Sequence, residues 1–158
     1  MLSFKKIIYA ALFLISSCGF SPLNNNTNPQ KLLEVVSIQE PNTQNEFIFY
    51  SRLIDRFGEF GDRYVLNYSI STSSKDRALN FDGTPHRITI VGSVSYSLKD
   101  SKNGEILISE KEEMHLSFSN SGSTAAVLNA ERTINEQLVV LLADKVIDRL
   151  VLIIVAKG

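Results

Sequence analysis

Cysteine is almost absent from this chain of 158 residues, which contains one, and glycine and proline are scarce, at eight and four. A single cysteine cannot form an internal disulfide or a Cys-rich zinc site. So little Gly and Pro, together with 44% hydrophobic residues, excludes a collagen-like or wholly disordered chain. Lys and Arg number 16 against 17 Asp and Glu, so the basic excess of a general nucleic-acid-binding protein is missing. The length suits one domain with its own core.

A recognisable catalytic or metal-binding arrangement is also missing. Neither His86 nor His115 has a Cys, Asp or Glu at an established ligand spacing, and neighbours in a strand point to opposite faces. No Gly-x-Ser-x-Gly turn and no phosphate-binding loop occurs. The hydroxyl-rich residues 119–124 suit a loop and helix N-cap better than a nucleophile. We therefore expect no enzymatic activity, no cofactor and no metal.

The first 17 residues have the pattern of a signal peptide. Lys5 and Lys6 form a short positive region, and residues 7–15 after them are apolar and uncharged. A membrane-spanning helix needs about 20 such residues, whereas a signal peptide needs about 7–15. Residues 1–17 are therefore predicted to be a lipoprotein signal peptide that is removed.

Cys18 stands where a bacterial lipoprotein is acylated. Ile15-Ser16-Ser17-Cys18 resembles a lipobox, in which an aliphatic and two small residues precede the cysteine. This resemblance implies an S-diacylglycerol and an N-palmitoyl group on Cys18, and two or more chains give stable anchoring. Gly19, where Asp would retain the protein at the inner membrane, permits sorting to the outer membrane. The alternative is a secreted protein whose cysteine follows the cleavage site by chance.

Residues 18–31 are predicted to be the lipidated cysteine and a flexible tether, because residues 21–31 contain four Asn and two Pro. Residues 32–158 are predicted to be a single α+β domain. Its first strand is expected at residues 32–39, and three strands with alternating polarity follow a helix. The helix has a capping box, Thr43-x-x-Glu46, and a Gly58 C-cap, with an apolar face formed by Phe47, Tyr50, Ile54 and Phe57.

The three later strands are expected near residues 64–71, 87–98 and 106–119, with a polar loop at 73–86. In the last strand Ile106, Ile108, Met114, Leu116 and Phe118 are in phase. Glu110 and Glu112 share that apolar face, which predicts a bulge or an overhang.

A long helix is predicted over residues 122–155. It is apolar nearly all round after Leu138, so it is either buried on most sides or in contact with another protein. Charged residues interrupt it too often for a membrane span, and residues 151–158 could also be extended. The order β-α-β-β-β-α predicts a two-layer α+β sandwich, in which two helices cover one face of a four-stranded, mostly antiparallel sheet.

The other face of the predicted sheet is neutral and rich in short hydroxyl side chains. Exposed sheets often carry charge that prevents association. This face is therefore either an ordinary solvated surface or one that lies against a partner's polar wall through water-mediated hydrogen bonds. The expected partner-facing residues are Ser69, Ser71, Thr89, Ser93, Ser95 and Ser97, with Ser109, Ser117 and Ser119 in phase on the last strand.

Three cations, Lys75, Arg77 and Arg87, fall near one end of the sheet and could bind phosphate groups. A solvated loop, partly neutralised by Asp76 and Asp82, is the alternative interpretation.

Several motifs together resemble the LptE family of lipopolysaccharide-assembly lipoproteins, over residues 18–150. They are Cys18-Gly19-Phe20, Tyr64-x-Leu66-x-Tyr68, Arg87-x-x-Ile90-x-Gly92-x-Val94-x-Tyr96-x-Leu98, Ala130-Glu131-Arg132 and Leu142-Ala143-Asp144-x-x-Ile147-x-x-Leu150.

The resemblance implies a lipid-anchored protein of the outer membrane. Family members lie in the lumen of a large β-barrel, LptD, as a plug and assembly partner, and help deliver lipopolysaccharide to the outer leaflet. The phosphates expected at Lys75, Arg77 and Arg87 would then belong to lipopolysaccharide. A periplasm-facing lipoprotein that serves as a structural or ligand-binding module without a barrel is the alternative.

Overall fold

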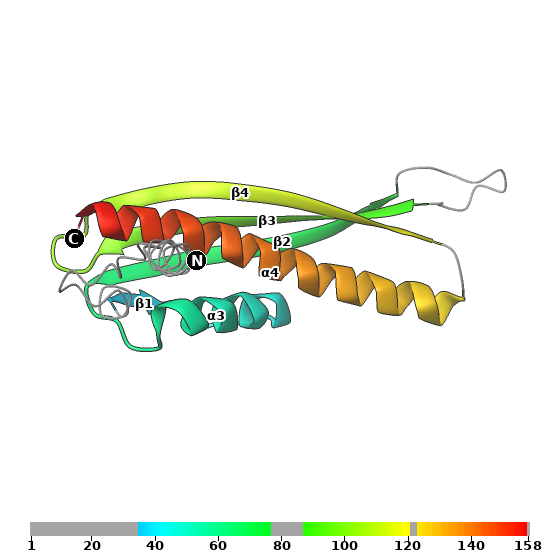
Figure 1. Ribbon diagram of the computed structural model, residues 1–158, viewed down its shortest axis with the longest axis horizontal. Coiled ribbons are helices and arrows are strands. Elements are labelled where there is room, and N and C mark those ends of the chain that lie inside the picture. The colour runs from blue at the N-terminus through cyan, green and yellow to red at the C-terminus, as the bar shows by residue number, and fades with distance from the viewer. Residues whose placement is uncertain (1–34, 77–86, 121–122, 158) are drawn as a thin grey trace, which may run out of the picture.

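Six elements follow one another along the chain in the computed structural model, which describes residues 35–76, 87–120 and 123–157 (Figure 1). The predicted signal peptide (1–17), the tether (18–31) and most of the polar loop lie outside the described residues. The elements are β1 (Val36–Ile38), α3 (Gln44–Phe57), β2 (Tyr64–Asp76), β3 (Arg87–Asp100), β4 (Ile106–Ser119) and α4 (Thr124–Lys157).

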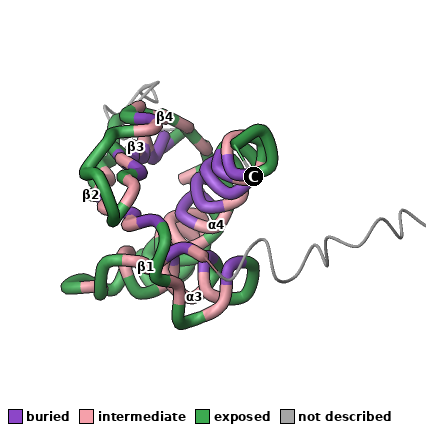
Figure 2. The backbone as a smooth tube through the Cα atoms, turned by 90° about the vertical axis from the view of Figure 1, so that its left-hand side faces the viewer, coloured by how far each residue is buried: buried purple, intermediate pink, exposed green. Residues whose placement is uncertain are grey.

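The sheet has the strand order β1-β2-β3-β4, with β1 parallel to β2 and the other pairs antiparallel. The helix α3 makes the crossover between the two parallel strands. Both helices lie on one side of the sheet, and the long strands and α4 give the molecule an elongated shape (Figures 1 and 2). The predicted α+β sandwich with a mostly antiparallel sheet is confirmed.

Residues at both ends of α3 explain where this helix begins and ends. Thr43 Oγ1 accepts a hydrogen bond from the Glu46 N–H (3.2 Å), and Glu46 Oε2 accepts one from the Asn42 N–H (2.8 Å). At the other end, Gly58 takes φ 78° and donates its N–H to the Ile54 carbonyl (2.8 Å). The predicted caps are confirmed.

The buried face of α3 differs from the predicted one. Phe49, Leu53 and Phe57 are fully buried, whereas Phe47 is 61% exposed. Phe47 lies about 200° from Phe49 around the helix, so both cannot face the core. The apolar stripe of this helix is wide, and its centre follows the i, i+4, i+8 spacing that begins at Phe49.

Two strands have different limits from those predicted. Among the described residues, β1 covers only Val36–Ile38 of the expected 32–39. β2 continues to Asp76, so residues 73–76 are strand and not loop, and they pair with residues 88–91 of β3. Strand pairing outweighs the weak strand preference of the Ser-Ser-Lys-Asp sequence at this end.

The irregularity in the pairing of β3 and β4 does not lie at Glu110 and Glu112, where a bulge or overhang is predicted. The register shifts at Leu98/Lys99, which leaves Ile106 56% exposed and not in the apolar row. Glu110 and Glu112 stay in register on the inner face, because they have cationic partners on α4.

Two ion pairs join β4 to α4, and a third joins the residue just before β4 to the end of α4. They are Arg149 Nη2–Glu110 Oε1 (2.9 Å), Lys145 Nζ–Glu112 Oε2 (2.6 Å) and Lys157 Nζ–Glu105 Oε1 (3.2 Å). We refer to these three pairs as the β4–α4 seam.

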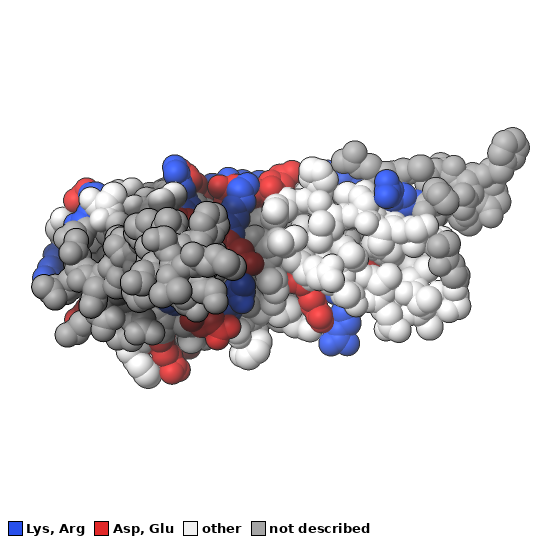
Figure 3. Space-filling model, in the orientation of Figure 1, with Lys and Arg blue, Asp and Glu red and all other residues white. Residues whose placement is uncertain are grey.

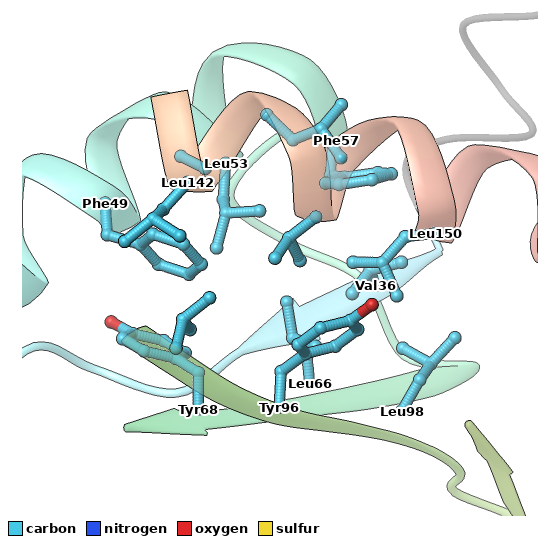
Figure 4. Close-up of a cluster of buried hydrophobic side chains, with 14 of the residues drawn as sticks. Val36, Phe49, Leu53, Phe57, Leu66, Tyr68, Tyr96, Leu98, Leu142 and Leu150 are labelled. Atoms are coloured by element: carbon cyan, nitrogen blue, oxygen red, sulfur yellow. The ribbon is translucent and has the colours of Figure 1, made fainter. Parts of the chain in front are cut away.

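The last element, α4, is helical as far as Lys157, so the alternative of an extended end is wrong. Ser123 Oγ caps it by accepting a hydrogen bond from the Ala126 N–H (3.4 Å). From Leu138 onward α4 packs against the sheet and α3, whose side chains converge in Figure 4. Its buried residues are Leu138, Val139, Leu142, Ala143, Val146, Ile147, Leu150 and Ile154.

The sandwich therefore has two halves along its long axis. The packed half contains β1, α3, residues 138–157 of α4 and the strand segments beneath them. The open half contains residues 70–76 of β2, 87–92 of β3, 114–119 of β4 and 124–137 of α4. Of the two described helices, it is α4 that faces most of the sheet in the open half, and its Leu128 is 60% exposed.

Candidate partner interface

Strand register places the predicted hydroxyl side chains in rows across the outer face of the sheet. One row is Asn67, Ser97 and Ser109; the next is Ser69, Ser95 and Lys111; the third is Ser71, Ser93 and Glu113. β4 contributes charges to two rows, whereas β2 and β3 contribute short neutral side chains. We call the β2 and β3 residues 67, 69, 71, 93, 95 and 97 the hydroxyl face.

The hydroxyl face forms a shallow hollow beside β4. Asn67, Ser69, Ser95 and Ser97 line it together with Ser109 and Lys111, and its volume is about 560 Å³. Ser71 and Ser93 are linked through their hydroxyls at 3.1 Å, while the exposed Ser69 and Ser95 keep polar groups available to solvent. Such a surface can approach a polar wall closely and exchange water-bridged hydrogen bonds with it.

Thr89 differs from the other residues expected on this surface. It is only 1% exposed, and its hydroxyl makes a 2.8 Å hydrogen bond with Ser117 on β4. The side chain therefore satisfies its polar group within the sheet. We leave Thr89 out of the hydroxyl face.

Two of the three predicted phosphate-binding cations are described. Lys75 lies opposite Thr89, and Arg87 lies opposite Ser119 in the adjacent row, so both belong to the outer face at the end of the open half. Diagonal neighbours of this kind have Cα atoms about 7–8 Å apart, within reach of one phosphate group for long side chains. Arg77 lies outside the described residues.

The packed half has a part-buried polar contact that joins β3, β4 and α4. The Tyr96 hydroxyl donates to Glu110 Oε2 (3.2 Å), and Arg149 holds the same carboxylate with Nε and Nη2. The hydrogen bond from Arg149 lowers the pKa of Glu110, and burial raises the pKa of Tyr96. This arrangement is structural, because the groups satisfy one another.

Sequence patterns did not reveal the polar contact at the boundary between the halves. Asn135 Nδ2 donates to Asn45 Oδ1 (2.8 Å), and Asn45 Nδ2 donates to Thr72 Oγ1 (3.2 Å), which joins α4, α3 and β2. Beyond it, an open cleft of about 380 Å³ lies between β2 and α4, with Ile90 and Leu128 among its lining residues. Two isolated asparagines in helices carry no sequence signal for such a contact.

The charged residues are unevenly distributed over the face of the molecule that Figure 3 shows. In Figure 3 the side of the molecule that holds the start of α4 shows few charged side chains. Over the described ranges, no group of three or more His, Cys, Asp or Glu residues is placed to hold a metal ion. No helix in the described part of the chain is both long and apolar enough to span a membrane.

Comparison with solved structures shows that known lipoproteins share this fold. A lipoprotein from Caulobacter crescentus aligns with a TM-score of 0.63 at 18% identity, over 82% of this chain and 97% of that one. Rare lipoprotein B from Shewanella oneidensis aligns at 0.59 and 12%, over 73% and 91%. A minor lipoprotein from Acinetobacter baumannii aligns at 0.52 and 10%, over 74% and 88%.

Sequence comparison gives the family. Among curated proteins, none matches this chain significantly. The family described as LptE, lipopolysaccharide-assembly, matches residues 31–150, which include every described strand and most of α4 but not Cys18. The resemblance seen in the motifs is thereby confirmed, and the chain belongs to the LptE family of lipopolysaccharide-assembly lipoproteins.

Proposed function

We propose that this lipoprotein lies within an LptD-type β-barrel of the outer membrane, which it plugs and helps to assemble for lipopolysaccharide transport to the outer leaflet. Family membership supports the assembly role. The hydroxyl face supports the proposed orientation, because the interiors of such barrels are polar, and this face is neutral, partly or fully exposed and made of short side chains. In this arrangement the hydroxyl face lies against the barrel's inner wall.

The orientation is tested by adding a charge to the hydroxyl face. Ser95 is exposed, so Ser95→Arg should leave the melting curve of the isolated domain nearly unchanged. Beside a close wall the added charge would be buried without a partner, at a large cost. We expect lower recovery of the barrel complex in mild detergent and greater outer-membrane permeability to large hydrophobic drugs.

Gln137→Arg is the matched control, because Gln137 is exposed on the opposite layer of the sandwich, in α4. If Ser95→Arg recovers the barrel at the wild-type level and Gln137→Arg does not, the interface lies on α4. A stable protein that never copurifies with a barrel would favour the alternative, a periplasm-facing structural or ligand-binding lipoprotein.

Cys18 provides the membrane anchor in this proposal, on the strength of the lipobox. Intact mass of the purified protein should show the loss of residues 1–17 and the gain of acyl groups. Cys18→Ala should remain unprocessed or leave the membrane fraction. A soluble wild-type protein with a free thiol would contradict the anchor.

Lys75 and Arg87 are the proposed contacts for lipopolysaccharide phosphates, since both are exposed cations on one end of the outer face. The double variant Lys75→Gln, Arg87→Gln should bind purified lipopolysaccharide more weakly than wild type. The double variant Lys99→Gln, Lys102→Gln is the control, because it removes the same number of exposed cations at the other end of the sheet. Equal weakening by both variants would indicate only a general effect of net charge.

A further inference from the structure

The two edges of the sheet are protected to different degrees. The β4 edge carries four consecutive charged residues, Glu110 to Glu113. On the β2 edge, β1 pairs only with Tyr64–Leu66, and no other described strand covers residues 67–74. Those eight residues contain no charge and no proline, and their pairing with β3 has no bulge. A long, regular, uncharged edge of this kind is a template for pairing with another strand.

The hydrogen bonds at the start of β2 show which backbone groups point to the β2 edge. The Ser101 N–H donates to the Arg63 carbonyl, so odd-numbered residues of β2 pair with β3. The Leu66 carbonyl accepts from the Gln39 N–H on the β1 side, so even-numbered residues face the edge. By this alternation the N–H and C=O groups of Tyr68, Ile70, Thr72 and Ser74 point toward the edge.

Space is available on both sides of the sheet beside residues 72–74 of this edge, whereas nearer Tyr68 the inner side is packed against Phe49 of α3. On the inner side the cleft between β2 and α4 is lined by Thr72, Ser74, Ile90 and Leu128 among others, and it is open to solvent. On the outer side the rows of the hydroxyl face end at β2. An added strand would alternate, with one set of side chains entering the cleft and the other extending the hydroxyl face.

We propose that residues 67–74 of β2 take up an extended strand of the barrel partner, as a fifth strand of the sheet. The incoming strand would have apolar side chains facing Ile90 and Leu128 and small polar ones beside Ser71 and Ser73. Main-chain hydrogen bonds supply the affinity in this mode of recognition. The proposal rests on the proposed function, and the barrel is the occupant because this edge is continuous with the hydroxyl face.

Matched proline variants test the edge. Ser74→Pro removes an N–H group that points outward and leaves the pairing with β3 in place, which proline tolerates at an edge. His115→Pro does the same on the β4 edge, where register places odd-numbered residues outward. In the full-length lipoprotein, Ser74→Pro should greatly reduce recovery of the barrel complex, while Ser74→Ala and His115→Pro recover it as the wild type does.

Further measurements keep failure of this inference distinct from failure of the proposed function. If Ser74→Pro lowers the melting temperature, Ser74→Lys replaces it, since an inward-facing charge also blocks an edge. If Ser95→Arg disrupts the complex and neither Ser74 variant does, the added strand is wrong and the barrel partner stands. If none of these variants disrupts the barrel complex, both the added strand and the proposed orientation of the hydroxyl face are wrong. A dimer of the isolated wild-type domain that Ser74→Pro dissociates would make a second copy the occupant and overturn the proposal.

Discussion

The packed half and the open half share one sheet and one long helix, yet they differ in how fully the inner side of the sheet is covered. In the packed half, α3 fills the space beside α4, and Phe49, Leu53 and Leu142 exclude water from the sheet. In the open half no second helix is present among the described residues, and Met114, Leu116 and Phe118 are only partly buried. The comparison teaches that one end of the sandwich supplies the stability, which leaves the other end free to present an edge and a cleft.

The largest expected contrast between the halves comes from deleting a leucine side chain in each. Leu142 is fully buried, so Leu142→Ala should cost about 2–5 kcal/mol of unfolding free energy. Leu128 is 60% exposed, so Leu128→Ala should change it by no more than about 0.5 kcal/mol. Denaturant unfolding of the two variants measures both values. Equal losses would contradict the division into halves.

A smaller effect is expected where the halves meet, at Gly92. A Cβ atom there would lie 2.5 Å from Leu138 Cδ2 and 3.1 Å from Leu142 Cδ1, so the sheet and α4 approach each other closely at this point. Gly92→Ala should therefore destabilise the protein by about 1–3 kcal/mol, as overpacking of a core does. Since the clashing atoms belong to flexible side chains, repacking could remove the strain. A melting temperature equal to wild type would show that the layers separate easily here.

The smallest expected effect concerns the β4–α4 seam and depends on pH. Arg149 lowers the pKa of Glu110 in the folded protein, so this contact stabilises the fold above the pKa of an unfolded Glu. The stabilisation is lost as pH falls through the lowered pKa of the folded state. Glu110→Gln should therefore lose less stability on acidification than wild type does. Parallel stability–pH curves for the two proteins would contradict this role.

The alternation of apolar and polar residues predicted which face of the sheet is covered, because burial in the strands follows that alternation. Tyr64, Leu66 and Tyr68 alternate in sequence and are all buried. The predicted apolar face of α3 includes Phe47, which is exposed, because an aromatic residue looks like a core residue in the sequence. The partners of Glu110 and Glu112 were not predictable, since they lie 39 and 33 residues further along the chain, on a helix whose rotation about its axis depends on packing.

Some features of the candidate interface were also predictable from the sequence and others were not. The phase of Ser69, Ser71 and Ser95 fixed their common face, because alternate residues of a strand share a side. The hydroxyl of Thr89 finds its partner in Ser117, 28 positions away, and the long stretch of β2 that no other described strand pairs with follows from the shortness of β1. Neither property belongs to a local pattern, so neither was accessible from the sequence.

The position of α4 in the chain also affects when the strands can be covered during synthesis. The inner side of the sheet, with Leu66, Val94 and Leu98, has its main packing partner in residues 138–154, which follow all four strands in the chain. Contacts between residues that are far apart in the sequence form slowly, because the chain between them must first be ordered. Until those residues emerge, the growing chain keeps apolar strands without a cover, a state prone to aggregation. A chain cut off before Leu138 should therefore keep its strands uncovered and fail to form this sandwich, although it would contain every described strand.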